Sequence, residues 1–331
     1  MIKFATIGTS KITRKLMEVA KDCDDFKLVA VYSREKATAE SFGKEYGAEI
    51  YFDHLDDLEK CTSVDAVYIA SPNSLHYDQA IQLLRSGKHV LCEKAMGSNA
   101  KEVDTMLQVA KENNVLLLEA MRSLFDPGQR LIKDNLYKLG TIRRATINYC
   151  QYSSRYDGFK RGERTNIFDG NLSAGALMDI GVYCVHSLID LFGSPNEVSA
   201  SSVFLANGID GAGSILAKYD TMIAEVIYSK ITNSYLPSEI QGEAGVMLIS
   251  DAPNPRKITI RYNDNSEEII EVEPCENNMV YELRAFMKAI ETKKEMSRFH
   301  EVSLEAMKLM DQVRSQIGVK FPADYRVEFM K

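Results

Sequence analysis

The first 120 residues alternate between short apolar segments of strand length and longer amphipathic segments with a helical period. Strands that alternate with helices of about ten or more residues pair in parallel, through right-handed crossovers. The alternation therefore predicts a doubly wound parallel sheet, whose ligands bind at the carboxyl ends of the strands. The predicted strands are 2–7, 27–32, 49–51, 64–70, 89–92 and 115–119, and the predicted helices are 12–21, 37–46, 55–60, 77–86 and 99–113.

After Pro127 the pattern changes from alternation to a run of strands with turn residues between them. Such a run predicts an α+β domain with a large, open, mainly antiparallel sheet. We therefore expect two domains, at 1–121 and 122–331. An open sheet face is a large apolar area, which predicts a homodimer or homotetramer through this sheet. The predicted strands are 140–152, 198–206, 214–219, 224–229, 238–242, 246–250 and a hairpin over 257–272, and the predicted helices are 126–136, 174 to about 193, 279–292 and 302–317.

Composition and charge exclude several classes of protein. The formal net charge of -7 argues against a nucleic-acid partner, because such proteins usually carry a basic surplus. The N-terminal segment lacks the layout of a signal peptide, and no run of about 18 apolar residues predicts a transmembrane helix. The six cysteines are scattered without C-x-x-C pairs, which favours reduced thiols in the cytoplasm and offers no metal site.

The loop after the first strand is a candidate phosphate loop. The usual dinucleotide fingerprint is G-x-G-x-x-G, and here only the first glycine, Gly8, is kept. Ser10 still allows close backbone approach, while Thr13 is expected to loosen the packing of the helix on the strand. The position at a helix start favours phosphate binding. The candidate cofactor residues of this loop are Gly8, Thr9, Ser10, Lys11 and Ile12.

The end of the second strand indicates which dinucleotide is preferred. An NAD site favours an acidic residue there, but this chain has Ser33 and Arg34. Arginine offers a planar fork for a phosphate, so the sequence favours NADP, with NAD possible. The alternative is a solvated surface arginine, because Glu35 follows immediately.

Two further strand ends carry polar residues that would face the nicotinamide half of the crevice. The fourth strand is followed by a segment that either binds the cofactor or caps a helix. The fifth strand is followed by Lys94, for which the alternative is a solvated lysine. The candidate residues of these two strand ends are Ser71, Pro72, Asn73, His76, Glu93 and Lys94.

A helical stretch from Ala174 carries three proton-handling side chains, Asp179, Tyr183 and His186. Their spacing of i, i+4 and i+7 places them on one face of a helix. Gly181 lies between them, where glycine costs roughly 1 kcal/mol relative to alanine unless a cofactor ring or another backbone approaches closely. The alternative is a core helix with a satisfied histidine and a tolerated glycine.

Taken together, these motifs resemble the Gfo/Idh/MocA oxidoreductases, most closely the branch of glucose–fructose oxidoreductase and the dimeric dihydrodiol dehydrogenases. The resemblance covers essentially the whole chain and implies a Rossmann domain, NAD(P) between two domains and a lysine near the reacting carbon. Ser10, Thr13 and Ala95 depart from the family pattern, Ala95 by replacing the proline of an E-K-P motif. The matching segments are the first-strand loop, Ser71 to His76, Glu93 to Ala95 and Asp179 to His186.

The leading hypothesis is an NADP-linked dehydrogenase acting on a hydroxyl or carbonyl carbon of a sugar, polyol or cyclic diol. Lys94 would orient the hydroxyl and stabilise oxyanion charge, and Asp179 would bind a neighbouring hydroxyl or orient His186. Either His186 or Tyr183, which the resemblance implicates, would carry the proton. The second hypothesis is a catalytically silent NAD(P)-binding regulator. A polar loop at 153–173 either covers the substrate or is a solvated flap.

Overall fold

The computed structural model describes residues 1–251 and 253–326, and it divides into two compact units. The first unit contains Met1–Met121 and Asn277–Ser303, and the second contains residues 122–276 together with the chain from Leu304 onward. Our predicted second domain ran unbroken over 122–331. Residues 277–303 instead fold with the first unit, and residues 252 and 327–331 lie outside the described residues.

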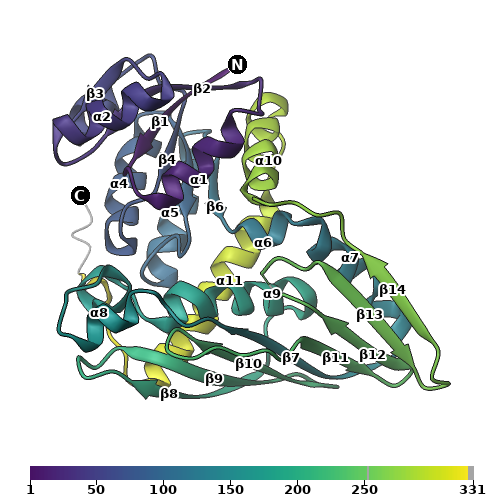
Figure 1. Ribbon diagram of the computed structural model, residues 1–331. Helices are drawn as coiled ribbons and strands as arrows, with labels where there is room; N and C mark the ends of the chain where they lie inside the picture. Colours follow the sequence, from purple (N-terminus) through teal and green to yellow (C-terminus); the bar gives the residue numbers. More distant parts are fainter. Residues whose placement is uncertain (252, 327–331) are drawn as a thin grey trace. The chain divides into compact units, whose positions relative to one another are not determined.

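The first unit is a doubly wound parallel sheet with strand order β3-β2-β1-β4-β5-β6, as predicted (Figure 1). The order reverses between β1 and β4, and ligands of such sheets bind outside the strand ends at this point. Its strands are β1 (Ile2–Ile7), β2 (Phe26–Tyr32), β3 (Ile50–Phe52), β4 (Ala66–Ile69), β5 (His89–Glu93) and β6 (Leu117–Ala120), and its helices are α1 (Lys11–Ala20), α2 (Lys36–Tyr46), α3 (Leu55–Lys60), α4 (Asn73–Arg85), α5 (Ala100–Glu112) and α10 (Met279–Thr292).

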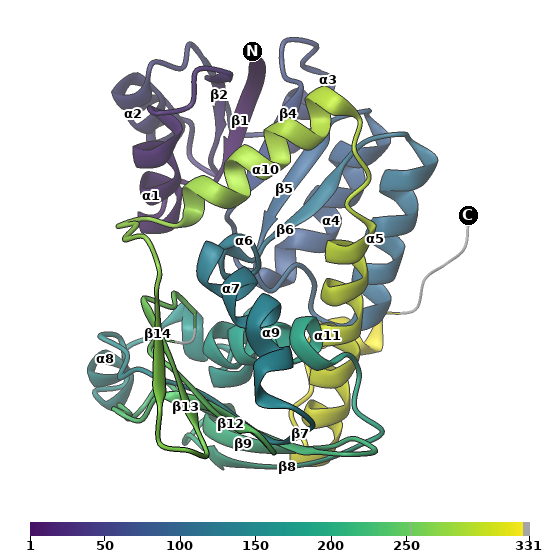
Figure 2. The same ribbon diagram turned by 90° about the vertical axis from the view of Figure 1, so that its right-hand side faces the viewer.

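Helix α10 belongs to the first unit because its apolar face completes the core beside α1 and β6 (Figure 2). Phe286 is fully buried, and its ring lies 6.1 Å from that of Phe4 on β1. The amide of Asn277 donates to the carbonyl of Lys15 at 2.8 Å and fixes the start of the helix. A contact between residues so distant in the chain leaves no local pattern, so the sequence did not reveal it.

The second unit contains an eight-stranded sheet with order β14-β13-β12-β11-β7-β10-β9-β8. Its strand pairs are antiparallel except β7 with β10, which confirms the predicted open, mainly antiparallel sheet. The strands are β7 (Ile142–Cys150), β8 (Glu197–Phe204), β9 (Asp210–Lys218), β10 (Ile223–Ser229), β11 (Ser238–Gly242), β12 (Gly245–Ile249), β13 (Lys257–Tyr262) and β14 (Glu267–Glu271), and the α-helices are α6 (Arg122–Phe125), α7 (Pro127–Asn135), α8 (Tyr156–Lys160) and α9 (Val182–Phe192), with α11 (Ser297–Ile317) continuing in from the first unit.

The two faces of this sheet differ in burial. Ile215 and Val226 are buried on the face that α9 covers. Their neighbours along the strands point to the opposite face, because side chains alternate along a strand. On that opposite face Leu216, Ile223 and Ile269 are 43%, 37% and 51% exposed. The sheet therefore presents a partly apolar surface on its second side.

A long apolar stretch, Gly170–Phe192, meets the length and composition of a membrane span. We predicted no transmembrane helix because the chain has no unbroken apolar run, whereas this stretch qualifies on average. Within it, 83% of the most apolar window is buried inside the protein. The stretch contains the central helix of the second unit, and its apolar residues are those of a core helix.

The polar loop predicted at 153–173 is folded on its own small aromatic core. It contains α8 and two short 3-10 turns, and the rings of Tyr156, Phe159 and Phe168 lie within 6.3 Å of one another. Lys160 donates to Tyr152, and Arg164 pairs with Asp169. These basic side chains pair locally and remain at least half exposed, so both predicted roles of the loop, a cover for the substrate and a solvated flap, stay open.

Candidate active site

The loop after β1 turns on a glycine that no other residue can replace without strain. Gly8 has a φ of +98°, in the left-handed region, and its N–H donates to the carbonyl of Tyr32. A Cβ at this position would lie 2.8 Å from the carbonyl oxygen of Ala70. The loop therefore passes directly over the end of β4, with no room for a side chain.

The loop leads into the N-terminus of α1, a ten-residue helix. Ser10 is the N-cap residue, and its hydroxyl makes no capping hydrogen bond, which leaves the first-turn N–H groups without a cap from this side chain. Thr13 is fully buried, and its hydroxyl has no partner among the described residues. A side chain thus fits where the fingerprint has its third glycine. The glycine turn and the helix N-terminus fit the pyrophosphate of a nicotinamide dinucleotide, with Thr9, Lys11 and Ile12 in the same loop.

Arg34 lies beyond the end of β2 and is exposed. It makes no hydrogen bond or ion pair with any other residue that the structure describes. Glu35, which could have neutralised it, occupies the N-cap position of α2 and accepts a hydrogen bond from Thr38. The guanidinium beside Ser33 therefore remains available to an anionic ligand.

Helix α4 begins at Asn73, four residues earlier than predicted, with Pro72 as its N-cap residue. His76 is consequently inside the first turn and is fully buried. Its Nε2 lies 2.8 Å from the carbonyl oxygen of Ser71, and its Nδ1 lies 3.0 Å from that of Ala95. Burial lowers the pKa of this imidazole, while the two carbonyls act in the opposite direction. The ring links the loop after β4 to the loop after β5.

Lys94 follows β5 and sits between residues that are held firmly. Glu93 is buried and accepts a hydrogen bond from the hydroxyl of Tyr68, while the carbonyl of Ala95 faces His76. The N–H of Met96 donates to the carboxylate of Glu119 at 2.9 Å. The peptide bond between Lys94 and Ala95 is cis. The hydrogen bonds at Ala95 and Met96 hold the backbone after the lysine, which is partly exposed.

The central helix of the second unit is not regular. Residues Leu177–Gly181 form one π-helical turn, η4, and α9 follows directly. Asp179 lies in the π turn, whereas Tyr183 and His186 lie in α9. A π turn inserts an extra residue and shifts the phase of the helix, and such turns are frequent at functional sites. The sequence pattern assumed a regular helix and did not predict this shift.

The three side chains differ in their surroundings. His186 is fully buried, and its Nδ1 lies 2.8 Å from the carbonyl oxygen of Val182 in the preceding turn. Tyr183 is half-buried, with the guanidinium of Arg122 5.5 Å from its ring centre and the ring of Tyr149 edge-on at 5.8 Å. Tyr183 is thus accessible and lies beside a cation, while His186 points into the core.

Gly181 lies close to two core side chains. A Cβ at this position would lie 3.1 Å from the ring of Tyr228 on β10 and 3.1 Å from the side chain of Leu177. We expected a cofactor ring or another backbone to be the close neighbour, and the structure assigns that role to a tyrosine ring. The glycine lets the helix lie close against the sheet.

Lys230 forms an ion pair with the candidate residue Asp179, and the sequence did not single it out. Its Nζ lies 2.9 Å from the carboxylate of Asp179, and the two side chains are only 13% and 26% exposed. Lys230 directly follows the buried strand β10. Lys94 also follows a buried strand directly. However, β10 belongs to a mixed sheet, and the rule that ligands bind at strand ends describes parallel sheets.

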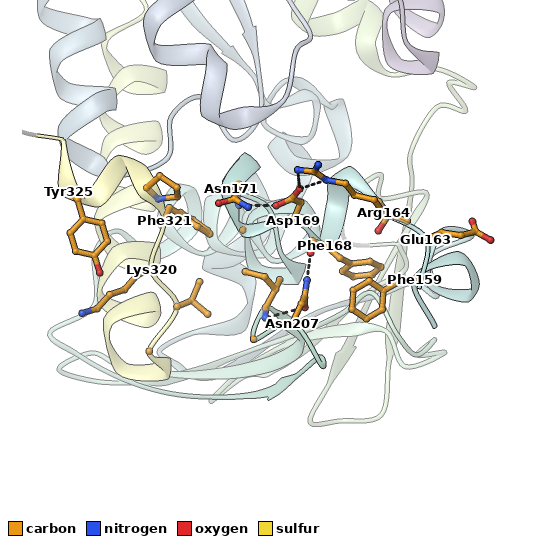
Figure 3. A pocket seen from close by; sticks show the side chains of 17 residues that line it. Phe159, Glu163, Arg164, Phe168, Asp169, Asn171, Asn207, Lys320, Phe321 and Tyr325 are labelled. Carbon is orange, nitrogen blue, oxygen red and sulfur yellow. Dashed lines mark hydrogen bonds and ion pairs between the residues drawn. The ribbon is translucent and has the colours of Figure 1, made fainter. Parts of the chain in front are cut away.

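A separate cavity of about 830 Å³ lies between the loop containing α8, the turn before β9 and the segment after α11 (Figure 3). Two nitrogens of Arg164 donate to Asp169, whose other oxygen accepts the N–H of Asn171. The amide of Asn207 donates to the carbonyl of Phe168. These polar groups satisfy one another, and neither Asp179 nor Tyr183 lines the cavity.

Comparison with known families decides the identity of the fold and its class of chemistry. Residues 2–121 match the family described as "Oxidoreductase family, NAD-binding Rossmann fold", and residues 130–248 match the "GFO/IDH/MocA C-terminal domain". The chain belongs to the Gfo/Idh/MocA oxidoreductase family. It is an NAD(P)-dependent oxidoreductase acting on CH–OH groups.

Individual relatives cover nearly the whole chain. The scyllo-inositol 2-dehydrogenase (NADP(+)) IolU of Bacillus subtilis is 44% identical over 326 residues, which is 98% of this chain and 99% of IolU. The mouse trans-1,2-dihydrobenzene-1,2-diol dehydrogenase is 28% identical and covers 91% of this chain and 92% of its own length. KijD10, a 3-ketoreductase from Actinomadura kijaniata solved with NADP and TDP-benzene, shares the fold with a TM-score of 0.86, at 24% identity over 96% of this chain and 98% of KijD10.

The turn at Gly8 can be tested by Gly8→Ala. The substitution forces a side chain into the left-handed region and against the carbonyl of Ala70, so the loop must move. We expect the Kd for NADPH, measured by fluorescence titration, to rise about tenfold or more.

Gly47→Ala is the matched control, because Gly47 has a φ of +79° but no atom within 4 Å of a built Cβ. It shares the backbone strain and lacks the clash, so it should lose about 1 kcal/mol of stability and keep its cofactor affinity. Equal affinities for Gly8→Ala and the wild type would contradict the assignment of this loop.

Proposed function

We propose that this protein is an NADP-linked dehydrogenase that transfers a hydride between nicotinamide and a ring carbon of a cyclic polyol of the inositol type. Sugars, other polyols and cyclic diols form the wider substrate class. The observation that carries the proposal is the 44% identity to a scyllo-inositol 2-dehydrogenase (NADP(+)) over 98% of this chain. The exposed and uncommitted Arg34 supports NADP over NAD.

The bound cofactor would accept or return the hydride, and the loop from Gly8 to Ile12 would hold its pyrophosphate. The protein's own side chains must then bind the hydroxyl and move its proton. Lys94, held on a fixed strand end, would orient the reacting oxygen and stabilise negative charge on it. A lysine acts here as a compact point charge with three donors.

Tyr183 is our candidate for the proton-transferring group. It is half-buried rather than sealed in the core, and the guanidinium of Arg122 lies 5.5 Å from the centre of its ring. His186 is fully buried and bonded to its own helix, which suits a residue that holds the helix in place. The choice between the two residues, which the sequence left open, thus falls on Tyr183.

Asp179 and Lys230 would recognise the hydroxyls next to the reacting carbon. The two side chains form an ion pair and are partly exposed, so one offers acceptors and the other offers donors to a polyhydroxylated ring. Neighbouring hydroxyls on a polyol need both kinds of partner. Of the two roles considered for Asp179, the ion pair with Lys230 favours binding of a neighbouring hydroxyl over orientation of His186.

The cofactor preference can be measured with Arg34→Asp. Loss of the guanidinium removes a charge-assisted contact with the 2′-phosphate and adds repulsion, so the Kd for NADPH should rise about 10–100-fold. The Kd for NADH should change by less than about threefold. Both constants come from calorimetric titration.

Lys27→Asp is the control for this titration. It makes the same charge change at the exposed opposite end of β2, away from the ligand edge of the sheet. Equal binding of the two cofactors by the wild type, or equal loss of NADPH affinity in both variants, would contradict a phosphate contact at Arg34.

Proton transfer can be assigned with Tyr183→Phe and His186→Gln, using scyllo-inositol and NADP+. Tyr183→Phe keeps the ring beside Tyr149 and should lower kcat about 10²–10⁴-fold without weakening NADPH binding. His186→Gln should lower the free energy of unfolding while kcat changes less than in Tyr183→Phe, because it disturbs a buried packing position.

The opposite ranking of these two variants would place the proton on His186. A wild-type protein that binds NADPH and turns over nothing across a panel of inositols, sugars and diols would favour the silent regulator instead.

We further propose that the protein is cytoplasmic and assembles as a homodimer or homotetramer through the open face of the eight-stranded sheet. All six cysteines are free thiols, and Leu216 and Ile269 expose apolar surface on that face. Leu216→Glu should dissociate the assembly in light-scattering measurements, whereas Tyr137→Glu, at an exposed site in a 3-10 turn after α7, should not. A monomeric wild-type protein at micromolar concentration would contradict the assembly.

A further inference from the structure

The central helix of the second unit begins on a buried carboxylate from another element. Helical geometry starts at Ala176, and the first-turn N–H groups of a helix have no partners within the helix itself. The N–H of Leu177 donates to Oδ2 of Asp210 at 2.7 Å, and the N–H of Ala176 bonds to the same carboxylate. Asp210 is the first residue of β9 and is only 2% exposed. The helix is therefore capped by a residue that lies 33 positions away.

Gly175, the residue before the helix, packs directly against this carboxylate. Gly175 has a φ of +139°, and a Cβ there would lie 2.2 Å from Oδ1 of Asp210. The carbonyl of Gly175 accepts the N–H of Asp179 at 3.0 Å. Asp210 is thus linked to Asp179 through one backbone residue. The only side chain that this contact tolerates at position 175 is a hydrogen atom.

The cap and the π turn together determine where Asp179 and Tyr183 lie. The π turn occupies Leu177–Gly181, immediately after the capped turn, and Gly181 packs on the ring of Tyr228. The extra residue of the π turn is thus confined between a fixed start and a fixed packing contact. Movement of the start would change the phase of the helix over Asp179 first.

We propose that Asp210 is a positioning residue that fixes the start of the helix and thereby the placement of Asp179 and Tyr183. The inference rests on the proposed function, because it takes these two residues as members of the active site. Asp210 acts through the helix and contacts neither substrate nor cofactor itself.

Burying the charged carboxylate of Asp210 lowers the stability of the folded protein, and its role as a helix cap explains why the charge is kept. Burial raises its pKa to about 6, whereas the amides of the helix and the positive charge of Arg314 act against this rise. The other groups facing it are the phenol of Tyr228 on β10 and, through Arg314 on α11, the carboxylates of Asp311 and Asp324. An anion at a helix N-terminus holds the first amides more firmly than a neutral group does.

The sign of the pH effect follows from this raised pKa. Because the folded protein holds the proton more tightly than the unfolded chain, ionisation of Asp210 lowers stability as the pH rises toward and through about 6. Asp210→Asn is neutral at every pH, so the part of the pH dependence of the melting temperature that comes from Asp210 should be absent in this variant.

The experiment compares the wild type with Asp210→Asn and Asp126→Asn. Asp126 is equally buried and caps α7 in the same unit by accepting the N–H of Gly128, but α7 carries no proposed site residue. With scyllo-inositol and NADP+, Asp210→Asn should lower kcat about tenfold or more while the Kd for NADPH is unchanged. Hydrogen exchange of peptides covering 174–186 should accelerate in this variant alone.

The pH dependence of kcat distinguishes a positioning role of Asp210 from a role in stability alone. The kcat of the wild type should fall toward the Asp210→Asn value as the pH drops through about 6, and that decline should be absent in the variant. Asp210→Ala removes both acceptors and should lose more kcat than Asp210→Asn does.

Three results would overturn the proposal. They are unchanged exchange over 174–186 in Asp210→Asn, faster exchange with unchanged kcat, and a loss of kcat that Asp126→Asn matches. A wild type without turnover would refute the proposed function instead, and hydrogen exchange would then still decide whether Asp210 fixes the helix. Failure of the two proposals is therefore distinguishable.

Discussion

The second unit depends on how closely its central helix lies against the sheet. Gly181 allows the ring of Tyr228 to approach the helix backbone, and the buried carboxylate of Asp210 holds the first amides of the same helix. These two contacts set both the distance and the start of the helix. With them fixed, Tyr183 reaches a partly exposed position and His186 remains in the core. The placement of Tyr183 for the proposed proton transfer therefore depends on the packing at Gly181 and on the helix cap at Asp210.

Much of the fold could be predicted because local sequence patterns determine most of its strands and helices. Apolar runs between helical segments located the six strands of the parallel sheet, and 55–60, 238–242 and 279–292 match the observed elements at both ends. The membership of α10 in the first unit could not be predicted, because it depends on Phe286 meeting Phe4 across most of the chain. The early start of α4 was missed because the polar residues after β4 resemble a loop.

Candidate site residues could be singled out only where they follow a recognisable element. Lys94 became a candidate because it follows a parallel strand, whereas Lys230 did not, although it follows β10 in the same way. The π turn was not predicted, because the spacing of Asp179, Tyr183 and His186 was interpreted as that of a regular helix. Asp210 was also missed, since its role arises from a contact with Leu177 that no spacing rule describes.

Direct hydride transfer between a polyol ring carbon and nicotinamide can be followed with an isotope label. The protein would be incubated with NADP+ and scyllo-inositol that carries deuterium on its ring carbons, and the NADPH formed would be examined by mass spectrometry and proton NMR. Direct transfer gives NADPH with a single deuterium at C4 of the nicotinamide ring. NADPH without deuterium, or no NADPH from any deuterated inositol, sugar or diol tested, would contradict it.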